Sequence, residues 1–298
     1  MLLFDTHADT LFRLCFPYGE NQELDVTREK LLRGGVSVQV MAMFVGRSDL
    51  PSIQIAFDKM LAKKEELKQN GFRQVDDLKE AKDGEGAFML SVEGCDLLDG
   101  HGEMLSDWRR QGVRMAALTW NYENCVATPA SKDATSGLKP FGREAVREMQ
   151  RLKMAVDVSH LNEKGFYELL EMGVIPLASH SCCRKLCNHV RNLTDDQLKA
   201  LFSAGGYVGV NFYPAFLQKS GKATLAHVCD HVIHMLEMGG EGKIGFGSDF
   251  DGIETKPDGL SGPQDFPKLM DALRKRGLDE KLIRGIAGEN LLHYYERI

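Results

Sequence analysis

Six side chains able to bind metal ions occur at the ends of short apolar runs of the chain. His7 and Asp9 close the run in LLFDTHADT (residues 2–10), and side chains two positions apart on a strand point to the same side. The other four close later apolar runs and are Glu93, His160, His180 and Asp249. Imidazoles and carboxylates bind divalent metals such as zinc, and a carboxylate can bridge two ions about 3.5–4 Å apart. The set predicts a centre with two metal ions.

Each of these residues alone has a second interpretation, as a polar side chain that is hydrogen-bonded to a neighbouring loop. Two further groups compete with the set. His227, His231 and His234 share a face of a predicted helix and resemble the HExxH zinc motif, but no glutamate follows His227, so we interpret them as packing and surface residues. The other group lacks any CxxC spacing and is a weak candidate; its members are Cys182, Cys183, Cys187 and His189.

Regular alternation of strand and helix patterns indicates how the six residues are positioned. The apolar, β-branched runs span 2–7, 37–45, 87–93, 114–120, 154–160, 174–180, 207–212 and 243–249. Helical patterns lie between them, several ending at glycine, and include 52–71, 142–153, 193–206 and 223–240. Eight such units, with no GxGxxG after the first run, favour a (β/α)8 TIM-type barrel over an open doubly wound sheet.

In a barrel of this kind the C-terminal ends of the strands form one rim, where catalytic residues collect. All six candidate ligands are expected at that rim, which weakens the interpretation of each as an isolated loop contact. The turn-rich segment 121–140 is expected to lie over the mouth of the barrel, and 279–298 to form closing helices. No linker divides the chain, so residues 1–298 are expected to form a single catalytic domain.

Composition narrows the classes of function. The 298 residues are 43% hydrophobic and 27% charged, as in ordinary soluble globular proteins, and the formal net charge of −6 argues against nucleic acid as a partner. The seven cysteines are scattered and odd in number, which favours reduced thiols. Since the sequence shows neither a secretory signal pattern nor a long apolar span, we expect a cytoplasmic protein without a membrane anchor.

Seven motifs, in order along the chain, resemble those of the membrane (renal-type) dipeptidases, the zinc peptidase family M19 of the amidohydrolase superfamily. They are HxD in DTHADT, the glutamate of SVEGCD, DVSH, ASHS, RNLTDD, VNFY and GFGSDFDGI. The resemblance runs from residue 4 to about residue 293. It implies a metal-dependent dipeptidase, with a small dipeptide as substrate and a homodimer as assembly.

The resemblance also implies a role for each matching residue. His7 and Asp9 would bind one zinc ion, and a water or hydroxide would bridge it to the second. The remaining implied assignments are His160 and His180 for the second zinc, Glu93 as the bridging ligand, Asp249 as the general acid and base, Arg191 for the carboxylate of the dipeptide and Tyr213 for the substrate pocket. Other divalent metals are compatible with the same ligands.

One position departs from the better-known members of the family. They carry LTH after the fourth strand, whereas this chain has LTWN, with Trp120 in place of a histidine that contacts the scissile carbonyl. An indole N–H donates one hydrogen bond but does not become cationic. The alternatives are therefore another binuclear amidohydrolase, acting on a lactone, cyclic amide or N-acyl amino acid, and a non-catalytic relic of the barrel. The family's tolerance of D-residues makes L,D-dipeptides candidate substrates.

Overall fold

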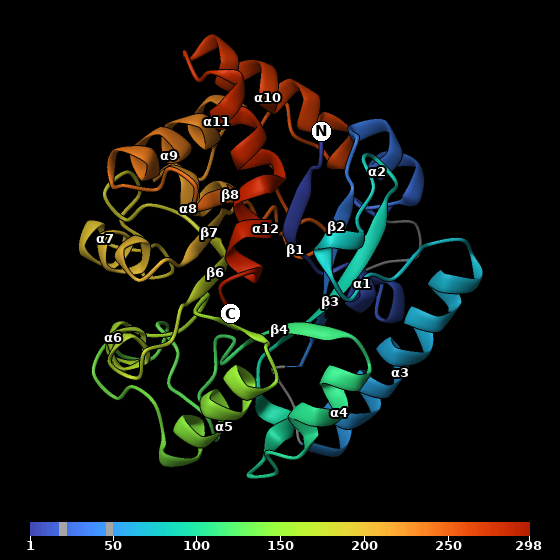
Figure 1. Ribbon diagram of the computed structural model, residues 1–298, viewed down its shortest axis with the longest axis vertical. Helices are drawn as coiled ribbons and strands as arrows, with labels where there is room; N and C mark the ends of the chain where they lie inside the picture. Colours follow the sequence, from blue (N-terminus) through green and yellow to red (C-terminus); the bar gives the residue numbers. More distant parts are fainter. Residues whose placement is uncertain (18–22, 46–49) are drawn as a thin grey trace.

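Eight parallel strands dominate the computed structural model, which describes residues 1–17, 23–45 and 50–298. The strands pair in chain order and β8 pairs with β1, which closes the barrel (Figure 1). The strands are β1 Phe4–Ala8, β2 Val38–Phe44, β3 Ala87–Glu93, β4 Val113–Ala117, β5 Ala155–Asp157, β6 Leu177–Ser181, β7 Tyr207–Val210 and β8 Ile244–Phe246. Each overlaps one of the eight predicted ranges, so the predicted (β/α)8 barrel is confirmed.

Helices connect the strands and surround the barrel (Figure 1). The α-helices are α1 Thr10–Cys15, α2 Arg28–Gly34, α3 Leu50–Gln69, α4 Met104–Arg110, α5 Pro140–Arg151, α6 Glu163–Glu171, α7 Asp195–Ser203, α8 Pro214–Leu217, α9 Leu225–Glu237, α10 Phe266–Lys275, α11 Glu280–Arg284 and α12 Asn290–Tyr295. Short turns of other helix types are η1 Leu78–Glu80, η2 Asp96–Leu98, η3 Pro263–Asp265 and η4 Gly285–Glu289. The last of these joins α11 to α12, as the predicted closing helices require.

Local sequence explains where the longer helices end. Gly71, Gly205 and Gly239 follow α3, α7 and α9 and have φ angles of 86°, 83° and 93°, the left-handed conformation that glycine adopts without strain. At the start of α7, Thr194 and Gln197 form a capping box in which each side chain accepts a hydrogen bond from the other's backbone N–H. The glycine endings predicted from the sequence are therefore confirmed at these helices.

The two ends of the barrel are built differently. At one end, alternate strand residues such as Phe4, Val40 and Met89 pack with Leu291 and Tyr294 of α12, which lies across the barrel in Figure 1. This apolar plug closes the N-terminal end of the strands. The polar side chains instead follow the C-terminal ends of the strands, where the predicted rim lies.

Candidate metal centre

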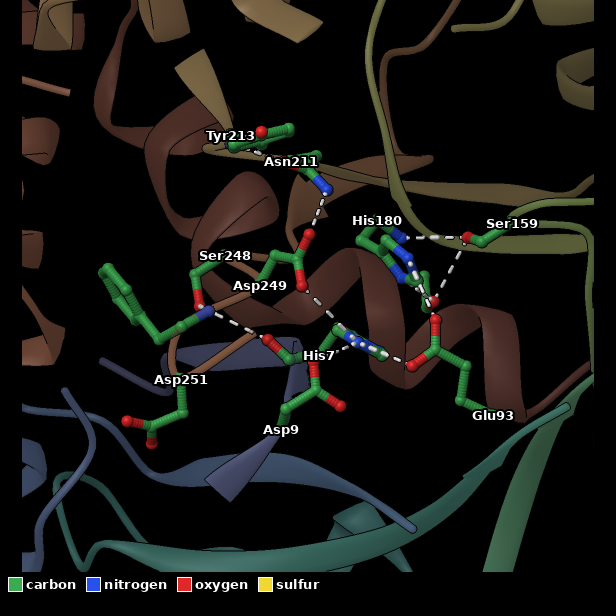
Figure 2. A network of polar contacts seen from close by, with 12 residues as sticks. His7, Asp9, Glu93, Ser159, His180, Asn211, Tyr213, Ser248, Asp249 and Asp251 are labelled. Atoms are coloured by element: carbon green, nitrogen blue, oxygen red, sulfur yellow. Dashed lines mark hydrogen bonds and ion pairs between the residues drawn. The ribbon is translucent and has the colours of Figure 1, made fainter. Parts of the chain in front are cut away.

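The structure brings all six predicted metal-site residues to the C-terminal rim of the barrel, and Figure 2 labels five of them: His7, Asp9, Glu93, His180 and Asp249. His7 is in β1, and Asp9 is the first residue after that strand. Glu93 is the last residue of β3. Of the other three, His180 is in β6 and His160 lies in the loop that follows β5, whereas Asp249 lies in the loop that follows β8, the strand that pairs with β1.

Glu93 lies at the centre of the cluster, with its two oxygen atoms facing different histidines. Its Oε2 atom is 3.6 Å from Nε2 of His7. Its Oε1 atom is 3.0 Å from Nε2 of His160 and 3.6 Å from Nε2 of His180. The same Nε2 atom of His7 also lies 3.6 Å from a carboxylate oxygen of Asp9 and 3.8 Å from one of Asp249. The arrangement is that of one carboxylate between two sets of ligand atoms.

Hydrogen bonds outside the cluster determine which nitrogen of each histidine carries a proton. His160 donates from Nδ1 to Oδ1 of Asn121 at 2.9 Å. Ser179 donates its hydroxyl proton to Asp157 at 2.5 Å, and its oxygen, 2.7 Å from Nδ1 of His180, therefore accepts from that ring. Both rings are thus left with unprotonated Nε2 atoms, which lie 3.1 Å apart beside Glu93. A cluster of acceptor atoms without a donor between them fits a cation.

The pKa values of the histidines are consistent with a site that requires positive charge. Burial, reinforced by the positive charge of Arg191, lowers the pKa of His160 and His180 well below the usual value, so both are neutral, the form that binds metal. Burial also lowers the pKa of His7, but the surrounding carboxylates, Glu93 foremost, outweigh it and raise that pKa to about 10. The carboxylates therefore attract a positive charge to this point of the site.

Two buried ligand atoms have no hydrogen-bond partner in the described part of the chain, Nε2 of His7 and Oδ1 of Asp9. Leaving a buried polar atom unpaired costs about 1–3 kcal/mol, and a metal ion at this point would remove that cost. Two groups of side chains place their ligand atoms within 4.8 Å of one another: His7, Glu93 and His180, and His7, Asp9 and Asp249. The residues present therefore fit metal ions of the zinc type.

Asp249 is held beside these ligands by its neighbours and by an unusual backbone conformation. Its Oδ2 atom accepts a hydrogen bond from Nδ2 of Asn211 at 2.9 Å. Burial raises its pKa to about 6, with Asp9 adding to the rise while His7 and Asn211 oppose it. Its φ angle is 67° and that of His160 is 68°, both in the left-handed region that costs non-glycine residues energy. A carboxyl group with a pKa near neutrality suits proton transfer.

The glycines of GFGSDFDG allow other groups to approach the backbone closely. The left-handed residues of this segment are Asp249 and Asp251, with φ of 67° and 66°. A Cβ at Gly247 would lie 1.8 Å from the carbonyl oxygen of Ser179, and one at Gly252 would lie 2.0 Å from Oδ2 of Asp9. These glycines are needed because other groups approach the backbone closely.

The cluster opens into a cavity of about 580 Å³ that also contains the three predicted substrate-binding residues, Arg191, Trp120 and Tyr213. The side chain of Arg191 is buried, and its Nε and Nη2 atoms have no hydrogen-bond partner among the described residues. Burial lowers the pKa of Arg191 to about 10, so the guanidinium stays charged at neutral pH. Trp120 and Tyr213 follow β4 and β7 and line the same cavity.

The competing histidines on α9 have structural roles. His231 is buried, accepts a hydrogen bond at Nδ1 from the backbone N–H of Cys183 and donates from Nε2 to the carbonyl of Leu217. His227 takes part in the capping box at the start of the helix, and His234 lies 2.8 Å from Asp195. Their interpretation as packing and surface residues is confirmed.

The cysteine group likewise remains without support as a metal site. Cys182, Cys183 and Cys187 are all free thiols, and neither they nor His189 belong to a metal-binding group in the part of the chain that the structure describes.

Sequence reasoning missed the residues that orient the ligands. Asn121 and Asn211 bond to His160 and Asp249, and the Asp157–Ser179 pair bonds to His180. Their one signal is adjacency, because each lies in or beside a quoted motif: LTWN, VNFY, DVSH or ASHS. Adjacency alone does not predict which side chain contacts which ring.

The family of the chain follows from comparison with known proteins. All of residues 1–298 match the model described as membrane dipeptidase, peptidase family M19. The chain belongs to this family. An uncharacterised protein from the pqqA 5′ region of Klebsiella pneumoniae is 35% identical over 71% of the chain and 82% of its own length. An uncharacterised dipeptidase of Schizosaccharomyces pombe is 38% identical, and dipeptidase tcpJ of Claviceps purpurea is 33% identical, over 70% and 73% of the chain. The chain spans about half the length of these fungal relatives, 52% in each case.

Solved structures show the same fold. A metallopeptidase from Rhodobacter sphaeroides, bound to a phosphinate mimic of the dipeptide L-Ala-D-Ala, superposes with a TM-score of 0.92 and 24% identity over 100% of this chain and 99% of its own. An M19 metallopeptidase described as dipeptidase AC superposes with a TM-score of 0.91 and 25% identity over 100% and 98% of the two chains.

The word membrane in the family's name raises the question of a spanning helix. Among the helices of the described residues, none combines the length and the apolar character needed to cross a membrane. The cytoplasmic location inferred from the sequence stays a prediction.

Proposed function

We propose that this M19 family member is a metal-dependent dipeptidase that hydrolyses the peptide bond of dipeptides. The observation that carries the proposal is the position of Glu93, whose two oxygens face separate histidines. The same cavity holds the guanidinium of Arg191, two of whose nitrogens have no hydrogen-bond partner among the described residues. A metal-activated water and a carboxylate-binding cation in one cavity are the two requirements for cleaving a short peptide at a fixed distance from its C-terminus.

The ligands divide into two sets with Glu93 between them. His7 and Asp9 would hold one zinc ion and His160 and His180 the other, with Glu93 contacting both. When bound, the two ions would polarise the scissile carbonyl and lower the pKa of a water molecule towards about 7. Manganese, cobalt or iron could take the same donor atoms.

The chain's own residues would supply proton transfer and substrate position. Asp249, oriented by Asn211, would accept a proton from the attacking water and deliver it to the departing amine nitrogen. The planar guanidinium of Arg191 would bind the substrate carboxylate through two parallel hydrogen bonds. Because that carboxylate must lie one residue beyond the scissile bond, the distance favours dipeptides over longer peptides.

Trp120 is the main reason to keep a second candidate function. An indole N–H can donate a hydrogen bond to the developing oxyanion but provides no positive charge there. The same centre could therefore act on a lactone, cyclic amide or N-acyl amino acid. The L-Ala-D-Ala mimic bound by the Rhodobacter sphaeroides enzyme supports L,D-dipeptides as substrates to be tested.

The test is release of amino acids from L,L- and L,D-dipeptides by the zinc-reconstituted protein, with and without a chelator. Chelation is expected to abolish activity and zinc to restore it. Asp249→Asn is expected to lower kcat by at least about 100-fold, the usual contribution of a general acid–base group. Asp271→Asn, on the exposed surface of α10, is the matched control and should leave kcat unchanged. Full activity after chelation, or in Asp249→Asn, would contradict the proposal.

A second experiment separates the dipeptidase from a lactonase. The C-terminal carboxylate of the best dipeptide is converted to an amide, which removes the negative charge that Arg191 would bind. A dipeptidase of the proposed kind should lose most of its kcat/KM on the amide. Efficient lactone hydrolysis together with inactivity on every free dipeptide would favour the second candidate.

A further inference from the structure

Four aromatic residues form a continuous wall on one side of the cavity, which we call the aromatic wall: Phe12, Phe16, Phe44 and Trp120. Ring centroids are 5.1 Å apart for Phe12 and Phe16, 5.1 Å for Phe12 and Phe44, and 4.8 Å for Phe44 and Trp120. All four side chains are half-buried and line the cavity. Apolar surface that is left uncovered inside a polar active site is suited to an apolar part of a ligand.

The position of the wall in the barrel relates it to Arg191. Phe12 is in α1, directly after β1, Phe44 ends β2, and Trp120 follows β4. Arg191 lies in the loop after β6, and in the closed ring β6 is four strands away from β2 in either direction (Figure 1). Phe44, at the middle of the aromatic wall, thus stands opposite Arg191 across the rim, with Phe12 and Trp120 to either side of it, after the strands β1 and β4.

Among the described residues, no charged side chain is part of the wall itself, although Nζ of Lys59 lies 5.2 Å from the centroid of the Phe16 ring. The charged residues lining the cavity in the described part of the chain are Asp9, Glu93, Arg191, Asp249 and Glu254. The first four belong to the metal centre or the carboxylate site, and Glu254 lies beyond β8. On α3, Ile53 extends the wall with a further apolar side chain. An acidic group placed against this surface would lose its hydration without gaining a partner.

We infer that the aromatic wall binds the side chain of the N-terminal residue of the dipeptide and selects large apolar or aromatic side chains there. The inference rests on the proposed function. When Arg191 holds the C-terminal carboxylate and the scissile carbonyl lies at the metal centre, the N-terminal residue extends towards the opposite side of the rim. That side is the wall, whose edge-to-face rings can continue their packing onto an aromatic substrate.

The test compares kcat/KM for dipeptides that differ only in the N-terminal residue. The zinc-loaded protein is assayed with Phe, Leu, Ala, Asp or Lys before one constant C-terminal alanine, of whichever stereochemistry wild type accepts. Phe and Leu are expected to exceed Ala by at least about tenfold, since even one methylene in an apolar pocket is worth that much. Asp is expected to fall below Ala, because its carboxylate would lose hydration at the wall.

Matched variants assign the preference to the wall. Phe44→Ala and Ile53→Ala are expected to reduce the ratio of kcat/KM for Phe over Ala to less than about threefold, because each removes apolar contact area. Ile55→Ala is the control, since Ile55 lies on the same helix as Ile53 but is 56% exposed. It should keep the wild-type ratio. Phe44→Leu is a milder change at the same site in case Phe44→Ala fails to fold.

The possible failures are distinguishable. If wild type cleaves no dipeptide, the proposed function is wrong and the inference falls with it. If dipeptides are cleaved with equal efficiency for all N-terminal residues, or fastest with Asp or Lys, the proposed function stands and the inference is wrong. A preference that survives unchanged in Phe44→Ala, Phe44→Leu and Ile53→Ala also overturns it.

Discussion

Two histidines of the candidate centre, His160 and His180, each depend on one acceptor that is not itself a ligand. Asn121 fixes the proton of His160 on Nδ1, and the Asp157–Ser179 pair does the same for His180. Each bond leaves Nε2 free to bind a metal and also fixes the plane of the ring. Partners of this kind commonly contribute 10–100-fold to metal affinity.

Asn121→Ala should therefore weaken zinc binding by about 10–100-fold, because His160 loses its acceptor and its ring is free to turn. Zinc affinity is measured by competition with a chelator, so the result does not depend on any substrate. Asn70→Ala, which is exposed at the end of α3, is the control. Equal zinc affinity in wild type and Asn121→Ala would show that Asn121 does not position the ligand.

At this scale the sequence was informative about residue type. Histidines and carboxylates at the ends of apolar runs are uncommon enough to be noticed, and all six predicted metal-site residues lie in one cluster. Asn121 could not be predicted, because an asparagine in a turn-rich segment ordinarily bonds to its own backbone. Its contact with His160 spans 39 positions of the chain.

At the scale of elements, the loop after β8 holds the most constrained part of the site. Asp249 and Asp251 both have left-handed backbone conformations, each costing about 1–3 kcal/mol unless its surroundings compensate. Ser248 donates hydrogen bonds to the carboxylate of Asp5 in β1 from both its backbone N–H and its hydroxyl. Asp251 accepts from the hydroxyl of Thr10 at 2.7 Å. These bonds fix the loop against the first βα unit of the barrel.

The substitution Gly252→Ala should disturb the metal ligands through this loop. A Cβ at this position would lie 2.0 Å from Oδ2 of Asp9 and 2.7 Å from Oδ1 of Asp249, so both carboxylates must move. We expect zinc affinity to fall by at least about tenfold, the effect typical of losing a residue that orients a metal ligand. Gly102→Ala is the matched control, because its nearest neighbour is an atom of Phe141 at 3.9 Å. Zinc affinity that is equal in both variants would mean that the loop yields without displacing the ligands.

The extents of the elements could largely be predicted, whereas their exact ends could not. Strand β3 matches its predicted range residue for residue, since all seven of its residues are buried and only Ser91 and Glu93 among them are polar. Strand β5 is only Ala155–Asp157, although the apolar run suggested 154–160. The N–H of Val158 still bonds to the carbonyl of Leu177 in β6. Beyond it, the side chain of Asp157 accepts hydrogen bonds from the backbone N–H groups of Ser159 and Ser179 in place of further strand pairing.

At the scale of the whole molecule, packing around the barrel also determines its stability towards acid. His231 on α9 connects three segments by accepting from the N–H of Cys183 and donating to the carbonyl of Leu217. Burial lowers its pKa to about 4, against 6.5 for an ordinary histidine. Between these values the unfolded chain binds a proton at this residue and the folded chain does not, so acid favours unfolding.

The free energy of unfolding should therefore fall by about 2 kcal/mol between pH 7 and pH 5 because of this residue alone. His231→Gln removes this titrating group. The unfolding free energy of wild type should therefore fall by about 2 kcal/mol more than that of His231→Gln between pH 7 and pH 5. Chemical denaturation of both proteins at a series of pH values measures it. His101→Gln, in an exposed loop, should retain the wild-type pH dependence, and parallel curves for wild type and His231→Gln would contradict the prediction.

The sequence by itself determined the class of fold and the chemical types present at the rim. Alternating apolar runs and amphipathic segments specify βα units locally, and parallel strands bring their C-terminal ends to one edge whatever the details of packing. Tertiary structure alone decided the distances at the site. The two oxygens of Glu93 face different histidines, and Phe44 of the aromatic wall stands opposite Arg191, because ring closure sets the order of the strands in space. Local sequence carries no information about contacts such as that between His7 and Asp249, which exist only once β8 pairs with β1.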